Sequence, residues 1–195
     1  MKRAILTTLL LFIAQSIFAQ FIKIDKTDRF GRIICTDFSE IYEHSGREGE
    51  FALSFFKTDE AISYSLLFKT QEDFDIRVGD KMLLKHENGQ ITEIECVDDG
   101  EKSTHVNSFG LSWLSPYPEF YRSTDGVIYS ITEGQLQDII SSPVQKIRIE
   151  EAFRYNDRKV GTSRGKSQVS SYIEEALSKI QSSLNEKNTG LYDGF

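Results

Sequence analysis

The hydrophobic residues of this 195-residue chain fall into short runs separated by polar turns. From Phe21 to about Phe153 these runs have the length and turn spacing of β-strands. The runs 51–56 and 62–68 are rich in Phe, Leu, Ile and Tyr, and Thr58-Asp59-Glu60 separates them. This arrangement predicts a hairpin, and the whole region is typical of an antiparallel sheet, a sandwich or a small, partly open barrel.

The strongest turn signal is Asn88-Gly89, which lies between the apolar-patterned segments 81–87 and 90–97. Asn-Gly tolerates the positive φ that a type I′ turn requires at both central positions, so these segments are predicted to form a second hairpin. Val78-Gly79-Asp80 predicts a turn before it, and Asp98-Asp99-Gly100 predicts a turn after it.

The aromatic segment from Phe109 to Tyr121 contains Pro116 and Pro118, which restrict it to an edge strand or an extended loop. Asp125-Gly126 then leads into a short predicted strand over 127–131.

Thr132 is the predicted N-cap of a brief helix over Glu133 to Ile140, and Pro143 ends the helical region. Apolar residues then alternate with Lys146, Arg148 and Glu150, which predicts a strand with one polar face.

The clearest single element is an amphipathic helix over about 168–187. Ser171 and Glu174 match a capping box, and the helical spacing of seven residues predicts the apolar stripe: Val169, Tyr172, Ile173, Ala176, Leu177, Ile180 and Leu184. The stripe needs a partner, and packing on one face of the sheet supplies it. The polar, glycine-bearing segment from Asn156 to Lys166 is expected to be a loop, and the tail 188–195 is expected to fray.

These elements predict one mainly β domain over 20–187, with seven or eight antiparallel strands and a C-terminal helix packed on them.

The N-terminal residues predict where the protein is located. Lys2 and Arg3 precede an apolar run over 4–14, and Ala19 before Gln20 matches a cleavage site, so residues 1–19 are predicted to be a secretory signal peptide. Since the first cysteine after the apolar run is Cys35, a free periplasmic or secreted product is favoured over a lipoprotein.

The net charge of the chain reduces the classes of partner that we expect. Removal of Lys2 and Arg3 with the signal peptide changes the formal net charge from −7 to −9. An acidic surface repels phosphate backbones and anionic headgroups, so neither nucleic acid nor stable membrane insertion after cleavage is expected.

The two cysteines leave two alternatives open. In an oxidising compartment Cys35 and Cys96 can form a disulfide, which would constrain the unfolded chain. Both lie in apolar, strand-like runs, where a reduced cysteine packs as a small hydrophobic residue.

Motifs of catalysis and metal binding are absent from the sequence. His44 and His105 fall in polar segments expected to be loops, and His86 is expected mid-strand in a solvated or cross-strand role. No nucleophile-elbow motif, paired-histidine zinc motif or EF-hand spacing occurs, and the segment 161–167 has one residue too few between its glycines for a phosphate-binding loop. We therefore expect no catalytic residue, no metal and no cofactor.

A group of basic residues gathers late in the chain: Arg154, Arg158, Lys159, Arg164 and Lys166. It is interpreted either as a local anion or protein contact or as a solvated loop.

Four aromatic residues around the two prolines are the best functional candidates: Trp113, Tyr117, Phe120 and Tyr121. Exposed aromatic rings stack on sugars and anchor peptides because they offer a large rigid surface at small entropic cost. The alternative interpretation is that these rings cover the open end of the sheet.

Three segments carry a resemblance to a known group. The 81–97 hairpin, together with YSITEGQL at 129–136 and VQKIRIE at 144–150, resembles small exported β-rich proteins of no known activity that are common in Bacteroidota. The resemblance covers about residues 75–155, and its motifs are structural. It implies the fold and the compartment, and it transfers no catalytic residue.

The expected function is therefore a non-catalytic exported protein that binds a protein or glycan partner. Two alternatives remain: a carrier of an apolar ligand, if the strands enclose a cavity, and an enzyme whose site is assembled from dispersed carboxylates.

Overall fold

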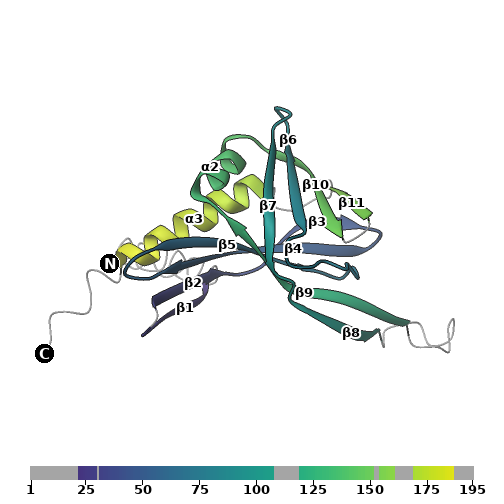
Figure 1. Ribbon diagram of the computed structural model, residues 1–195, viewed down its shortest axis with the longest axis horizontal. Helices are drawn as coiled ribbons and strands as arrows, with labels where there is room; N and C mark the ends of the chain where they lie inside the picture. The colour runs from purple at the N-terminus through teal and green to yellow at the C-terminus, as the bar shows by residue number, and fades with distance from the viewer. Residues whose placement is uncertain (1–21, 30, 108–118, 152–153, 161–168, 187–195) are drawn as a thin grey trace, which may run out of the picture.

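The computed structural model describes residues 22–29, 31–107, 119–151, 154–160 and 169–186. It is mainly β, as predicted, with an open antiparallel sheet and a C-terminal helix packed on it (Figure 1). The strands are β1 (Ile22–Asp28), β2 (Gly31–Thr36), β3 (Ser39–His44), β4 (Arg47–Lys57), β5 (Ile62–Thr70), β6 (Lys81–His86), β7 (Ile91–Asp98), β8 (Glu101–Asn107), β9 (Glu119–Ile131), β10 (Val144–Glu151) and β11 (Arg154–Lys159). The helices are α2 (Glu133–Ser141) and α3 (Val169–Glu186).

The described part of the chain thus has eleven strands, more than the seven or eight predicted. Their order in the sheet is β1-β2-β4-β5-β9-β7-β6-β10-β11, with β3 paired to β4 and β8 paired to β9. Every pairing is antiparallel. Hairpins alone cannot produce this order, because β9 inserts between β5 and β7.

The predicted hairpin around Thr58 is confirmed as β4–β5, the longest strand pairing of the sheet. The Thr58 hydroxyl accepts a hydrogen bond from the Ala61 N–H at 3.0 Å, which holds the turn. Phe51 and Phe68 lie opposite each other, and their rings meet edge to face at 5.7 Å. The aromatic runs that predicted the hairpin therefore supply its buried cross-strand pairs.

The second predicted hairpin is confirmed as β6–β7, but its turn differs from the predicted type I′. Gly89 has a φ of 85°, whereas Asn88 does not have a positive φ. The Gly89 N–H donates to the His86 carbonyl oxygen at 3.1 Å, and the His86 N–H donates to the Gln90 carbonyl oxygen at 2.9 Å. This is a three-residue loop in which only the glycine takes the left-handed conformation.

Strand β9 is longer than the predicted 127–131 strand, and Asp125-Gly126 lies inside it. Gly126, with a φ of 75°, bends the strand at this point. Residues 127–131 pair with β5, whereas residues 119–125 pair with β8, and Thr124 also pairs with Thr70 of β5 beyond a register shift. Gly100 lies against the bend, since a Cβ there would come within 2.3 Å of the Asp125 carbonyl oxygen.

The N-cap prediction for α2 is confirmed. The Thr132 hydroxyl accepts from the Gln135 N–H at 3.2 Å, and the Gln135 side chain accepts from the Thr132 N–H at 2.8 Å.

The capping box predicted at Ser171 is wrong, because α3 has already begun at Val169. The predicted apolar stripe of α3 does face the protein, and the helix packs on α2, β2 and β4.

The loop expected from Asn156 is also corrected, because residues 154–159 form the edge strand β11. Tyr155 and Lys159 point to solvent, while Arg158 points inward and is only 9% exposed. An arginine in an inward position breaks the alternation of apolar and polar residues by which a strand is predicted.

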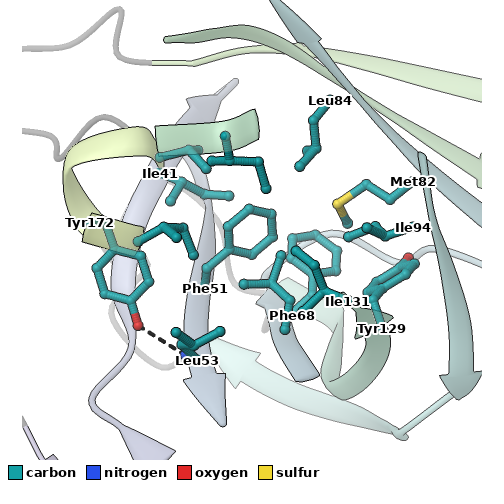
Figure 2. Close-up of a cluster of buried hydrophobic side chains, with 14 of the residues drawn as sticks. Ile41, Phe51, Leu53, Phe68, Met82, Leu84, Ile94, Tyr129, Ile131 and Tyr172 are labelled. Atoms are coloured by element: carbon teal, nitrogen blue, oxygen red, sulfur yellow. Dashed lines mark hydrogen bonds between the residues drawn. The ribbon is translucent and has the colours of Figure 1, made fainter. Parts of the chain in front are cut away.

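The hydrophobic core lies between α3 and the concave side of the curved sheet. Figure 2 shows Phe51 and Phe68 at its centre, with Met82, Leu84 and Ile94 from the β6–β7 hairpin on one side and Tyr172 from α3 on the other. The Tyr172 hydroxyl accepts a hydrogen bond from the Leu53 N–H at 3.2 Å. This bond lies where β2 ends and β3 begins along the same edge of β4.

None of the helices in the described ranges combines the length and the apolar character needed to span a membrane.

Candidate functional site

A hairpin formed by β8 and the first half of β9 projects from the sheet, and we call it the arm. Its register runs from Glu101 opposite Asp125 to Asn107 opposite Glu119. Within the described residues, β8 pairs with β9 alone, and the arm extends away from the rest of the sheet (Figure 1). The arm begins at the bend at Gly126, beyond which β9 enters the core.

The predicted ligand-binding residues all belong to this arm or to the segment that joins its strands. The backbone register places Phe120 opposite Val106 and Tyr121 opposite His105. Trp113 and Tyr117 lie outside the described residues, in the sequence between β8 and β9. The alternative interpretation, that the four rings cover the open end of the sheet, therefore stays a prediction for their side chains.

A surface pocket of about 150 Å³ lies at the base of the arm, where β9 meets β4 and β5. Its lining includes Glu48, Glu50, Ser123 and Asp125. The Ser123 hydroxyl donates to Asp125 Oδ2 at 3.1 Å, while Asp125 Oδ1 is buried without a hydrogen-bond partner among the described residues. The sequence analysis missed this site, because Asp125-Gly126 has the composition of an ordinary turn.

A second polar cluster, of Tyr42, Glu72 and Arg158, is deeply buried. Arg158 Nε and Nη2 donate to the two Glu72 oxygens at 2.9 and 2.6 Å, and the Tyr42 hydroxyl donates to Glu72 Oε2 at 3.0 Å. The Arg158 guanidinium also lies over the Phe74 ring, 5.3 Å from its centroid. Strand β3 carries Tyr42 and strand β11 carries Arg158, so the cluster joins the far end of the curved sheet to β3.

Electrostatics agree with a structural role for this cluster. Burial, followed by the charge of Glu72, raises the pKa of Tyr42 well above its usual range. Burial alone would lower the pKa of Arg158, but the hydrogen bonds and charge of Glu72 outweigh it, and the net pKa is raised. Tyr42 is thus held neutral and Arg158 charged, which agrees with a structural role for the two side chains.

The segment 71–80, between β5 and β6, is fixed by this cluster and by contacts with β9 and β10. The Phe74 N–H donates to Thr124 Oγ1 on β9 at 3.1 Å, and the Asp75 N–H donates to Glu151 Oε2 at the end of β10 at 3.0 Å. The burial of the Glu72 and Glu151 carboxylates therefore has a structural explanation, because they tie the segment 71–80 to β11 and β10.

Of the two roles predicted for His86, the solvated one is wrong, because the residue is only 1% exposed, whereas the cross-strand one is confirmed by its contact with Thr92 on β7. Its Nδ1 lies 2.7 Å from the Ser142 carbonyl oxygen, and its Nε2 lies 2.8 Å from Thr92 Oγ1. Because a carbonyl oxygen only accepts, Nδ1 carries a proton. The histidine joins the β6–β7 hairpin to the end of α2, and both ring nitrogens are engaged.

The other two histidines lie in strands and not in the expected loops. His44 is the last residue of β3, and His105 lies in β8. Within the described ranges, His, Cys, Asp and Glu side chains form no group of three or more that could hold a metal ion.

The cysteines are free and buried, so of the two alternatives the structure agrees with reduced cysteines that pack as small hydrophobic residues. Cys35 lies in β2 and Cys96 in β7, and strands β4, β5 and β9 come between β2 and β7 in the sheet. Burial is the main cause that raises the pKa of both thiols, and the pKa of Cys96 is about 11.

Comparison with known proteins finds no match to a protein-family model, to a curated protein or to a solved structure. The resemblance to exported β-rich proteins of Bacteroidota therefore stays a prediction.

Proposed function

We propose that the mature chain, beginning at Gln20, is an exported, non-catalytic protein that binds a protein or glycan partner through the arm. The observation that carries the proposal is the geometry of β8 and β9. A two-stranded hairpin that leaves the sheet gains little from the core, and isolated hairpins are only marginally stable. A hairpin retained in this position is suited to contact another molecule.

The sequence of the arm supports the same function. The connection between its strands contains Trp113 and Tyr117, and Phe120 and Tyr121 are the second and third residues of β9. Aromatic residues dominate the binding energy of protein interfaces and stack on sugar rings. The buried polar groups described above support a binding protein over an enzyme, since the Tyr42–Glu72–Arg158 cluster and His86 have structural partners.

Intrinsic fluorescence tests this proposal directly, because Trp113 is the only tryptophan of the sequence. The mature protein is titrated with fractions of native envelope and with a glycan library while Trp113 emission and its quenching by acrylamide are followed. Binding at the arm is expected to shift the emission to shorter wavelength and to reduce quenching. Ligands found in this way are then used for affinity measurements.

A W113A/Y117A variant is expected to lose affinity for such a ligand by about tenfold or more, as for interface hot spots. The matched control is Y155A, which removes an aromatic side chain that is 66% exposed on β11. A ligand that binds with unchanged Trp113 fluorescence, or that Y155A weakens as much as W113A/Y117A, would assign binding to another surface.

A further inference from the structure

The outer face of the sheet carries a row of three lysines, which we call the lysine row: Lys85, Lys146 and Lys159. They lie on β6, β10 and β11, and the strand register places Lys146 directly opposite both Lys85 and Lys159. Adjacent strands are ~4.8 Å apart, so the three positions follow one line across the strands. Like charges directly opposite each other destabilise a sheet.

The acidic residues near the row neutralise it only in part. Asp157 forms ion pairs with both Lys146 and Arg148. These partners draw the pKa of Asp157 far below its usual range. Among the described residues, Lys85 and Lys159 form no ion pair. A net positive strip thus persists on a chain whose acidic residues outnumber its basic ones by 30 to 23.

A groove lies along this strip. Its volume is about 190 Å³, and it is lined by Leu83, Lys85, Ile91, Lys146, Arg148 and Asp157. Leu83 and Ile91 supply apolar contact, and Ile91 is 57% exposed. Basic side chains around a partly apolar floor match an anionic ligand that also has a face of C–H groups.

We propose that the lysine row and its groove bind a linear acidic polysaccharide. The acidic groups of such a chain can recur once per sugar ring, a repeat close to the ~4.8 Å spacing of the strands. An extended peptide presents alternate side chains at ~6.8 Å, a poorer match to the row. Peptides also gain affinity on sheets chiefly by adding to a free edge. The groove lies over β6 and β10, which are hydrogen-bonded on both sides, and of the lysine row Lys159 alone lies on the edge strand β11.

This site is separate from the arm, which points in a different direction from the β6–β7 hairpin (Figure 1). The inference depends on the proposed function only for export, which would bring the protein to a compartment that contains polysaccharides. Binding in vitro is independent of the arm, so a W113A/Y117A variant is expected to bind the acidic polysaccharide like the wild type.

The test uses the mature protein and four probes: polygalacturonate, a sulfated glycan such as heparin, neutral dextran and poly-L-glutamate. Calorimetry or fluorescence anisotropy is expected to detect binding to the two acidic glycans, weakened by salt because the contacts are exposed ion pairs. Dextran is expected not to bind.

The decisive variant is K85Q/K159Q, for which acidic glycan binding is expected to weaken about three- to thirtyfold. Its thermal midpoint should stay equal or rise, because it removes repulsion within the row. The matched control is K26Q/K57Q, which removes two exposed lysines from β1 and β4 and is expected to change affinity less than twofold.

Three results would overturn the inference. The first is no binding of either acidic glycan beyond that of dextran. The second is an equal loss in K85Q/K159Q and K26Q/K57Q, which would reduce the effect to overall charge. The third is binding of poly-L-glutamate alone, lost in K85Q/K159Q, which would assign the groove to an acidic peptide.

Discussion

Arg158 and Glu72 form a buried bidentate ion pair across 86 residues of sequence, with N···O distances of 2.9 and 2.6 Å. The side chains are only 10% and 8% exposed. In the part of the chain that the structure describes, strand β11 pairs with β10 alone, so this contact, with Tyr42, secures the end of the curved sheet against β3. The stability of the fold is therefore expected to depend on a polar contact as well as on its apolar core.

The substitution E72Q tests this role. It leaves the Arg158 charge buried without its counter-ion, and such a loss typically costs ~3–5 kcal/mol of unfolding free energy. The expected result is a fall of this size, measured by urea unfolding at neutral pH.

R77Q is the matched control, since it breaks the Arg77–Asp75 pair at 2.9 Å, whose side chains are 56% and 50% exposed. It is expected to cost less than ~1 kcal/mol. A double variant, E72M/R158L, should recover most of the loss of E72Q, because it removes both charges together. Similar losses for E72Q and R77Q would contradict a structural role for the buried pair.

The same ion pair shows why part of the fold could not be predicted from the sequence. The hairpins around Thr58 and Asn88-Gly89, the cap at Thr132 and the stripe of α3 are local signals, and the structure confirms them. Strand β11 is not signalled locally, because its inward Arg158 is matched by a residue far away in the sequence. The sequence around Gly126 likewise predicts a turn. Only the pairings of β9 on both sides of Gly126 show that it is a bend within one strand.

Prediction of the arm and of the lysine row depends even more on knowing how the strands pair. The sequence predicted a ligand-binding group of four aromatic residues between Trp113 and Tyr121, but only the fold shows that β8 and the first half of β9 form an arm outside the path of the sheet. The basic residues around Arg158 were treated as one group, whereas the fold places Arg158 inside, pairs Arg154 with Glu151, and aligns Lys159 with Lys146 and Lys85. Arg164 and Lys166 lie outside the described residues.

Two buried tyrosines are expected to respond in opposite ways to loss of the hydroxyl. Tyr172 donates to the Asp37 carbonyl oxygen at 3.1 Å and lies 2.6 Å from Thr36 Oγ1. The Tyr129 hydroxyl is buried with no hydrogen-bond partner among the described residues. Y172F should therefore lose ~1 kcal/mol, while Y129F should be neutral or gain up to ~1–3 kcal/mol, because a buried unpaired group carries a desolvation cost.

Urea unfolding of both variants measures this difference, and each serves as the control for the other, because the same atom is removed from a buried ring. Crystal structures of the variants would show whether the rings keep their positions. A destabilised Y129F would mean that its hydroxyl has a partner in solution, such as a bound water.

The thiols are expected to be unreactive in the native protein. Cys35 and Cys96 are 6% and 0% exposed, and their pKa values are raised mainly by burial. Since the thiolate is the reactive form, a disulfide reagent at pH 8 should label neither residue within minutes. In denaturant it should label two thiols in the wild type and one in C35S. Recovery of no free thiol after denaturation of protein purified from its native compartment would contradict this fold, in which three strands separate Cys35 from Cys96.

Stability is expected to fall at alkaline pH, because several buried acids resist ionisation only when folded. Burial raises the pKa of Cys35, Cys96, Tyr42, Tyr129 and Tyr172. In the unfolded chain cysteine and tyrosine ionise near ~8.5 and ~10, so above about pH 9 the unfolded state releases protons that the folded state retains.

The unfolding free energy must then decrease as the pH rises from about 9, and for Cys96 the decrease ends near its folded pKa of about 11. Urea unfolding at pH 8, 9, 10 and 10.5 measures the slope. Y129F removes one of the ionising groups, so its free energy should decline less steeply than that of the wild type above pH 10. A wild-type stability that stays constant up to pH 10.5 would show that these groups reach water in the folded state, and it would argue against the closed packing of α3 on the sheet.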